Sequence, residues 1–162
     1  DGHEFIPQAI ENGAVAILSN GRSPKTKAVP ILQVKDPRLA MSQISAQFYG
    51  NPSEKMNIVG ITGTNGKTSI THILHHILQT SGAACGTLGT LGFQTPSGMV
   101  STGFTTPESV ELQQMLQTLI FAGVYNLVME ISSHALDLHR VDDVEVDIAV
   151  FSNLSPEHLD FH

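Results

Sequence analysis

An apolar run begins at residue 57, and its last three residues open the stretch Gly60-Ile61-Thr62-Gly63-Thr64-Asn65-Gly66-Lys67-Thr68. That run, 57–62, has the length of a buried strand, and 68–81 has the apolar spacing of an amphipathic helix. In a phosphate loop, glycines let backbone N–H groups turn inward, a lysine reaches the phosphates and a hydroxyl binds Mg2+. The order of strand, loop and helix therefore predicts a site for nucleotide phosphates.

We predict that the loop binds the nucleotide through consecutive residues, namely Gly63, Thr64, Asn65, Gly66, Lys67, Thr68 and Ser69. The general phosphate-loop pattern has a further glycine five residues before Gly66, where this chain has Ile61, so the string alone fails by one position. The flanking strand and helix carry the prediction instead. The alternative is a glycine-rich turn that binds nothing.

Composition excludes several classes of protein. The chain has 162 residues, 41% of them hydrophobic and 14% charged, which is typical of a packed globular fold. Fifteen acidic against eight Lys and Arg residues give a net charge of -7, which disfavours a nucleic-acid partner. No apolar run approaches the roughly 20 residues that span a membrane. The single cysteine, Cys85, fits a reducing, cytoplasmic compartment.

The first third of the chain has a different rhythm from the rest. Apolar spacing predicts a helix over 3–12, strands over 14–18 and 31–34, and a helix capped by Asp36 that begins at Pro37 and ends near Gly50. The break at Asn51-Pro52-Ser53 then separates residues 1–53 from 54–162. Because the ends at Asp1 and His162 look like cuts, we expect a piece of a longer protein.

Beyond the loop, strands and helices alternate. A bent strand or hairpin is predicted over 85–95, a helix capped by Thr106 extends to 122, and strands follow at 126–131 and 146–151. These strands are apolar on both faces, which is typical of central strands in a parallel sheet. We therefore predict an α/β fold, with a P-loop-type, mainly parallel sheet and flanking helices, preceded by the end of a small α/β domain.

Four segments, in this order, resemble the signature segments of the Mur ligase family. They are Thr62-Gly63-Thr64-Asn65-Gly66-Lys67-Thr68, Thr105-Thr106-Pro107-Glu108-Ser109, Met129-Glu130-Ile131-Ser132-Ser133-His134-Ala135-Leu136 and Asn153-Leu154-Ser155-Pro156-Glu157-His158-Leu159-Asp160. The resemblance covers nearly the whole chain. It implies that 1–53 is the C-terminal part of a UDP-substrate-binding domain and 54–162 the N-terminal part of an ATP-binding central domain.

Within the family, the chain is most similar to the ligases that add the third amino acid to UDP-N-acetylmuramoyl-L-alanyl-D-glutamate in peptidoglycan synthesis. The resemblance implies an ATP- and Mg2+-dependent amide ligase that works through an acyl phosphate. Its partners are then the UDP-N-acetylmuramoyl-dipeptide and a diamino acid, either L-lysine or meso-diaminopimelate. The present chain alone is expected to be inactive, and its oligomeric state stays open.

The resemblance also implies catalytic roles for Lys67, Glu130 and His158. Glu130 ends one predicted strand and His158 follows another, so both should face the crevice at the carboxyl ends of the strands. Thr68 would serve one Mg2+, and Glu130 with His158 a second. The alternatives are a solvated strand-end charge for Glu130 and a helix-start histidine, after Pro156, for His158.

Substrate contacts are implied for Thr105, Thr106, Ser132 and Arg140, with Ser133 beside them. Arginine suits this role because its guanidinium binds a carboxylate or phosphate in bidentate fashion. Leu138 departs from the family, which often has glutamine two residues before this arginine, so one substrate hydrogen bond is in doubt.

Two further features are interpreted without a site. His72 and His76 are four residues apart, but together with His75 they form the polar face of the predicted helix, so we expect exposure and no metal. Cys85 is interpreted as a small buried residue. Two rival functions remain: another amide-forming ligase such as a folylpolyglutamate synthetase, and a nucleotide-binding module without catalysis.

Overall fold

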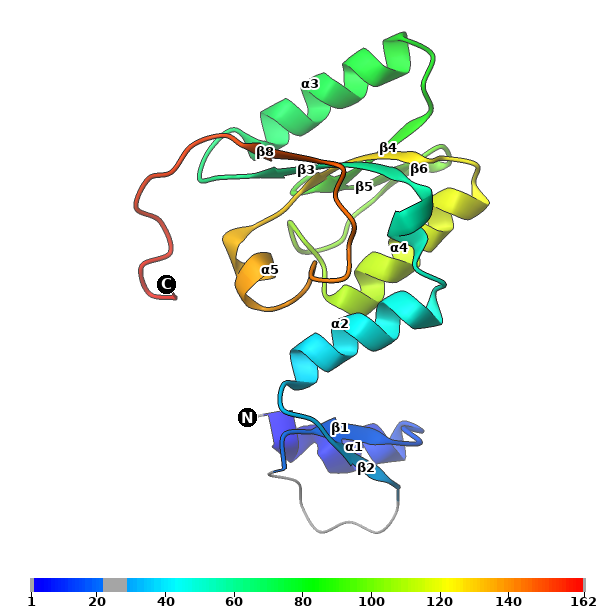
Figure 1. The fold of residues 1–162 in the computed structure, drawn as a ribbon, viewed down its shortest axis with the longest axis vertical. Helices are drawn as coiled ribbons and strands as arrows, with labels where there is room; N and C mark the ends of the chain where they lie inside the picture. The colour runs from blue at the N-terminus through cyan, green and yellow to red at the C-terminus, as the bar shows by residue number, and fades with distance from the viewer. Residues whose placement is uncertain (1, 22–28, 162) are drawn as a thin grey trace.

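The computed structural model describes residues 2–21 and 29–161, and its main feature is a six-stranded sheet. The strand order is β6-β5-β4-β7-β3-β8, in which β4, β7, β3 and β8 are parallel and β5 and β6 are antiparallel. The strands are β3 (Asn57–Thr62), β4 (Cys85–Gly89), β5 (Gly92–Thr95), β6 (Gly98–Val100), β7 (Asn126–Glu130) and β8 (Ile148–Phe151). The predicted mainly parallel α/β sheet is confirmed (Figure 1).

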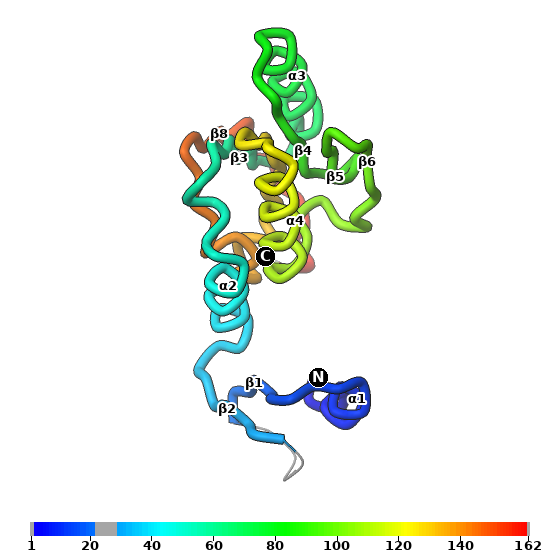
Figure 2. Tube along the Cα trace, turned by 90° about the vertical axis from the view of Figure 1, so that its right-hand side faces the viewer, coloured from blue at the N-terminus to red at the C-terminus, as the bar shows by residue number. Residues whose placement is uncertain are grey.

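Helices cover both faces of this sheet. The helix that follows the phosphate loop, α3 (Lys67–Thr80), lies on one face, and α4 (Ser109–Phe121) and the short α5 (Ser133–Asp137) lie on the other (Figure 1). The view turned by 90° shows α3 and α4 on opposite sides of the strands (Figure 2). Since β7 lies between β3 and β4, the chain crosses over a neighbouring strand on leaving β3, as in doubly wound sheets.

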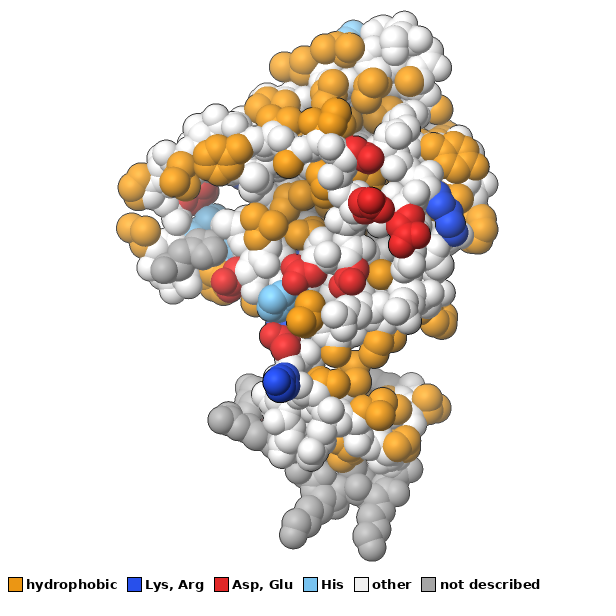
Figure 3. Space-filling view, in the orientation of Figure 1, with side chains coloured by type: hydrophobic (Ala, Val, Ile, Leu, Met, Phe, Trp, Pro, Cys, Tyr) orange, Lys and Arg blue, Asp and Glu red, His pale blue; other side chains and the backbone are white. Residues whose placement is uncertain are grey.

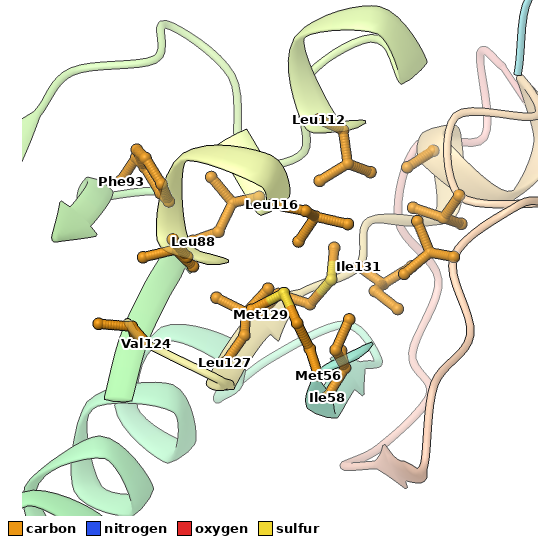
Figure 4. Close-up of a cluster of buried hydrophobic side chains, with 14 residues drawn as sticks. Met56, Ile58, Leu88, Phe93, Leu112, Leu116, Val124, Leu127, Met129 and Ile131 are labelled. Carbon is orange, nitrogen blue, oxygen red and sulfur yellow. The ribbon is translucent and has the colours of Figure 1, made fainter. Parts of the chain in front are cut away.

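Alternation along the strands divides the core into two layers. Ile58, Leu127 and Met129 belong to the larger apolar cluster, which packs under α4 (Figure 4). Ile61 and Val128 belong to the smaller cluster on the α3 side. Because successive side chains of a strand point to opposite faces, the residue two after Val128, Glu130, also faces α3. The parity of β7 thus directs this carboxylate to the phosphate-loop side.

The N-terminal part forms a separate small unit. A 3-10 turn (Gly2–Phe5) leads into α1 (Ile6–Glu11), and β1 (Ile17–Ser19) pairs in parallel with β2 (Ile31–Gln33). The helices and strands expected here exist but are shorter than predicted, and β1 also begins at residue 17 where 14 was predicted. Residues 22–28 lie outside the described part of the chain. A short 3-10 turn (Pro52–Lys55) occupies the expected break before β3.

The helix α2 (Pro37–Phe48) joins this unit to the larger sheet. Asp36 caps it as predicted, because its Oδ1 accepts from the backbone N–H of Arg38 at 2.8 Å and of Leu39 at 3.1 Å. The helix packs against α4, and its residues Ser42 and Ala46 are buried. Its apolar and small side chains therefore hold the N-terminal unit to the second part of the chain.

The start of α4 and the strand β6 differ from the predictions. Helix α4 begins at Ser109 with Glu108 as its N-cap, and Thr106 caps nothing. The Thr106 hydroxyl is used elsewhere, since it donates to the backbone O of Glu130 and accepts from the N–H of Ser132. The strand β6 was also missed, because its exposed residues lack an alternating pattern.

The polar face of α3 also differs from the prediction, because His75 was expected to be exposed. His75 is 6% exposed, and its Nε2 lies 3.0 Å from the carbonyl O of Cys85 on β4. Ile73 and Ile77, which the apolar spacing of 68–81 places on the core-facing side, are exposed. The stripe facing the sheet is centred on Leu74 and rotated toward His75, so helical periodicity placed the core-facing side about one residue off. Cys85 is buried as expected, and burial raises the pKa of its thiol to about 11.

No helix within the described residues combines the length and the apolar character needed to cross a membrane.

Candidate active site

The phosphate loop occupies the four residues between β3 and α3. Gly63 and Gly66 have φ angles of 124° and 90°, in the region that favours glycine. Gly66 is the N-cap of α3 and has no side chain to bond the free N–H groups of the first turn. Those groups and the positive end of the helix dipole attract an anion.

Lys67 places its ammonium group over this loop. Its Nζ donates to the carbonyl O of Gly63 at 2.6 Å and of Thr64 at 3.0 Å. The positive charge of Lys67 is therefore held close to the N-terminus of α3. A bound phosphate would compete with these two carbonyls for the ammonium group.

Glu130 is the buried acidic group of the site, with 1% of its surface exposed. Its Oε2 accepts from Thr68 Oγ1 at 2.9 Å and from Thr90 Oγ1 at 3.1 Å, and its Oε1 accepts from Thr90 N at 2.9 Å. No basic side chain in the described part of the chain forms an ion pair with it. A buried carboxylate beside a threonine hydroxyl supplies oxygen ligands of the kind that Mg2+ prefers.

Two residues that place this carboxylate were not predicted from the sequence. Thr90 makes two hydrogen bonds to Glu130, and Gly89 lies directly against it. A Cβ on Gly89 would overlap Glu130 Oε1 and lie 2.6 Å from its Cδ, so only glycine fits. A glycine inside a strand often marks such a close approach, and that signal was present at residue 89.

We expect Gly89→Ala to displace Glu130 and to lower, at least about tenfold, the ligase activity that the family resemblance implies for the full-length protein. The added methyl group cannot fit unless the carboxylate leaves Thr68 and Thr90. Steady-state kinetics with varied Mg2+ would measure the effect. Leu91→Ala, at an exposed position of the same turn, is the control and should behave like the wild type. Wild-type activity in Gly89→Ala would contradict this account of how Glu130 is held.

The predicted substrate residues lie around Glu130. The buried Thr106 bonds to the backbone of Glu130 and Ser132, as described above, and Thr105 Oγ1 lies 3.1 Å from Thr90 Oγ1. The hydroxyl of Ser132 caps α5 by accepting from the N–H of Ala135. Thr106 thus has a structural role, whereas Thr105 is near the surface.

Arg140 is held in place by acidic and carbonyl oxygens. Its NH2 lies 2.7 Å from Glu108 Oε1, and its NH1 donates to the carbonyl O of Thr106 at 3.1 Å. The guanidinium also lies 5.7 Å from the ring centroid of Phe104. Glu108 in turn pairs with Arg38 of α2 at 3.0 Å. Glu108 was expected only as part of the segment 105–109, and its pairing with Arg140 was not predicted.

His158 lies beside the phosphate loop. With Gly63, Lys67 and Ser132 it lines a cavity of about 340 Å³, and Glu130 is not among the lining residues. The His158 ring packs edge-on against His134, at 4.6 Å between ring centroids, and its backbone has a φ of 53°. The helix expected after Pro156 does not form among the described residues, which make a turn instead.

A second cavity, of about 420 Å³, does not suit phosphate. It lies between α2 and the loop before β8 and contains the acidic side chains of Glu54, Asp143 and Glu145. Figure 3 shows acidic side chains gathered across the middle of this face of the molecule, with few basic ones among them. An anionic ligand is therefore expected at the helix N-terminus and Lys67, not on the general surface.

A charged network joins α2 to the segment after α5. His139 Nδ1 lies 2.6 Å from Asp142 Oδ2, and its Nε2 lies 3.4 Å from Asp36 Oδ2. The hydrogen bond to Asp142, followed by the charges of Asp142 and Asp36, raises the pKa of His139. The stabilising contribution of His139 is therefore complete below the pKa of an unfolded histidine, about 6.5, and is lost as the pH rises through the higher folded value.

We expect His139→Gln to lower the thermal unfolding midpoint of the full-length protein at pH 5.5 and to have a smaller effect at pH 9. The reason is that the wild type loses the protonated imidazole at high pH, when the two proteins become electrostatically alike. Thermal unfolding across this range would measure the difference. His76→Gln, on the exposed side of α3, is the control. A difference between His139→Gln and wild type that stays constant with pH would contradict the expectation.

Comparison with known families bears on this geometry. A family model described as "Mur ligase middle domain" matches residues 61–162. This range includes the phosphate loop, Glu130, Arg140 and His158. The chain belongs to the Mur ligase family. The resemblance inferred from the four sequence segments is thereby confirmed.

Individual Mur ligases match along the whole chain. The UDP-N-acetylmuramoyl-L-alanyl-D-glutamate–2,6-diaminopimelate ligases of Caldanaerobacter subterraneus subsp. tengcongensis and Halalkalibacterium halodurans are 45% and 44% identical over all 162 residues. These residues amount to 34% and 33% of the two relatives, so the chain spans about a third of their length.

Solved Mur ligase structures have the same fold. A structure of a UDP-N-acetylmuramoyl-L-alanyl-D-glutamate–2,6-diaminopimelate ligase matches with a TM-score of 0.81 and 28% identity, covering 99% of this chain and 32% of that one. MurF from Acinetobacter baumannii matches with a TM-score of 0.58 and 23% identity, covering 99% of this chain and 31% of MurF, which supports the fold alone.

Proposed function

We propose that the full-length protein is an ATP-dependent ligase that adds 2,6-diaminopimelate to UDP-N-acetylmuramoyl-L-alanyl-D-glutamate. The observation that carries the proposal is the pairing of Thr68 with the buried Glu130 at the N-terminus of α3, beside Lys67. Relatives named for this activity are 45% and 44% identical over the whole chain. Of the two diamino acids implied by the sequence, diaminopimelate is favoured by these names.

The ATP γ-phosphate would first be transferred to the D-glutamyl carboxylate with release of ADP, and the incoming amine would then displace phosphate from this acyl phosphate to form the amide. Because the carboxylate and the triphosphate are both anionic, the site must neutralise charge while it holds the two in line. Lys67 and the first-turn N–H groups of α3 are suited to binding the phosphates. The fold holds the Lys67 ammonium group at the loop through two backbone carbonyls and leaves the first-turn N–H groups of α3 without a side-chain cap.

Mg2+ fits the oxygen ligands of Thr68 and Glu130. When bound, Mg2+ would supply positive charge that offsets the negative charge of the phosphates. Thr90 would keep the Glu130 carboxylate oriented toward Thr68 through its two hydrogen bonds. The role of His158 in holding a second Mg2+ stays a prediction, supported by its place in the cavity that Lys67 also lines.

The UDP-linked substrate is assigned to the side of the site formed by Thr105, Ser132 and Arg140. Arg140 is 13% exposed in its side chain and already oriented by Glu108, which leaves part of its guanidinium for a substrate anion. Thr106 would act indirectly, by holding the backbone of Glu130 and Ser132.

We also propose that residues 1–53 end a UDP-substrate-binding domain and that 54–162 begin the ATP-binding central domain. The separate two-stranded sheet of the first part supports this division. A cytoplasmic location is proposed because ATP and a UDP-linked precursor are found there.

The experiment is a ligation assay of the full-length protein. We expect ADP and a ligated product from Mg-ATP, UDP-N-acetylmuramoyl-L-alanyl-D-glutamate and meso-diaminopimelate, detected by mass spectrometry, and much less product with L-lysine. The present chain alone should give none, because it spans a third of the related ligases. Ligation of a folate substrate would favour a folylpolyglutamate-type ligase. ATP binding without product would favour a non-catalytic module.

A further inference from the structure

The phosphate loop is bonded to the segment that follows β8. Thr64 N donates to the carbonyl O of Asn153 at 2.9 Å, and Thr64 Oγ1 donates to the carbonyl O of Ser155 at 3.1 Å. Ser155 N donates back to Thr64 Oγ1 at 3.0 Å, and Ser152 Oγ donates to the carbonyl O of Asn65 at 2.8 Å. Residues 87 to 91 positions apart in the chain are thus joined directly at the loop.

The side chain of Asn153 makes the most specific of these connections. Its Oδ1 accepts from the backbone N–H of Asn65 at 3.0 Å, and its Nδ2 donates to the backbone carbonyl of the same residue at 2.9 Å. A carboxamide carries both an acceptor and a donor, so asparagine completes both bonds at once. Aspartate at this position would lose the donor and place a negative charge beside the Asn65 carbonyl.

This pairing affects which amides are free for phosphate. The N–H groups of Thr64 and Asn65 are turned to Asn153, whereas those at the start of α3 have no side-chain cap. The loop lacks the additional glycine of the general pattern, at Ile61, and is supported from outside instead. The approach is close, since a Cβ on Gly63 would lie 2.8 Å from the carbonyl O of Asn153.

The same segment leads to His158. Asn153 follows the end of β8 by two residues, Ser155 is bonded to the loop, and His158 then lines the cavity with Gly63 and Lys67. Hydrogen bonds therefore hold the start of this segment, just after β8, against the phosphate loop. A shift of the loop would move the start of the His158 segment with it.

We propose that Asn153 is a positioning residue, which holds the phosphate loop in its anion-binding shape and registers the His158 segment against it. The proposal rests on the proposed nucleotide-binding function of the loop. Asn153 acts through Asn65 and is assigned no contact with a reacting atom.

The test compares variants of the full-length protein. For Asn153→Ala we expect the calorimetric Kd for Mg-ADP and the KM for ATP to rise about tenfold, kcat to fall about tenfold, and the KM for the diamino acid to stay unchanged. Asn153→Asp should weaken nucleotide binding at least as much, because it removes the hydrogen-bond donor although it keeps the volume of the side chain.

Asn126→Ala is the matched control. Asn126 begins β7, at the far end of the sheet, where its side chain donates to the carbonyl O of Ala84 and accepts from Asn57. We expect it to lower the thermal unfolding midpoint about as much as Asn153→Ala, and to leave the Kd for Mg-ADP unchanged. Equal losses of nucleotide affinity in both variants would overturn the proposal, because they would reflect general destabilisation.

Two other results are decisive. Wild-type affinity for Mg-ADP in Asn153→Ala, or in Asn153→Asp, would overturn the role of the carboxamide. Wild-type protein that binds Mg-ADP but ligates nothing would overturn the proposed ligase activity alone, and a weakened Kd in Asn153→Ala would then still support the positioning role.

Discussion

Glu130→Gln is expected to lower kcat of the full-length protein by about two to three orders of magnitude. Glutamine keeps the size of the side chain and accepts from Thr90 N, but it removes the negative charge beside Thr68. Mg2+ would then lose an anionic ligand at the phosphate site. Steady-state ligation at saturating ATP, with Mg2+ varied, would measure the loss and a shift of the activity to higher Mg2+.

The control for this variant is Glu111→Gln, an exposed carboxylate on α4. It makes the same change of charge away from the loop and should leave kcat unchanged. A Glu130→Gln protein with wild-type turnover would contradict the assignment of this carboxylate to the site. A protein that does not ligate in its wild-type form but keeps its nucleotide affinity in Glu130→Gln would point to a nucleotide-binding module.

Lys67→Met should have an effect of similar size on kcat/KM for ATP, a fall of about two to three orders of magnitude. Methionine keeps most of the chain length and removes the ammonium group that now bonds the carbonyls of Gly63 and Thr64. Binding of ATP, measured by calorimetry, should weaken together with catalysis, because the charge is needed by the phosphates in both states.

Lys55→Met is a suitable control for Lys67→Met. Lys55 also donates its Nζ to a loop carbonyl, that of Gly50 at 2.8 Å, but far from the phosphate loop in the fold. Its replacement should leave ATP affinity unchanged. Undiminished ATP affinity in Lys67→Met would contradict the role given to the ammonium group.

The central strands and the phosphate loop were predictable because their signals are local. β3 and β7 are largely apolar runs, and the glycines between β3 and α3 and the lysine that begins α3 occupy fixed positions in the chain. The parity of β7 even places Glu130 on the same face as Val128 and therefore toward α3. These features need no knowledge of distant contacts.

The misses depend on contacts between distant parts of the chain. Thr106 fits a cap by sequence, yet its hydroxyl bonds to Glu130 and Ser132, 24 and 26 residues away. His75 fits an exposed face, yet it packs against the carbonyl of Cys85. Local propensity cannot report a partner brought near by the sheet order, and Thr90 and Asn153 were missed as partners for the same reason.

The central claim is that the loop at 63–68 binds a Mg-nucleotide through Lys67 and the α3 N-terminus, with Thr68 and Glu130 at the metal. Calorimetric titration of the full-length protein with ATP, with and without Mg2+, tests it most directly. We expect saturable binding of one nucleotide, strengthened by Mg2+ in the wild type and not strengthened in Glu130→Gln. Absence of ATP binding, or the same gain from Mg2+ in both proteins, would contradict the claim.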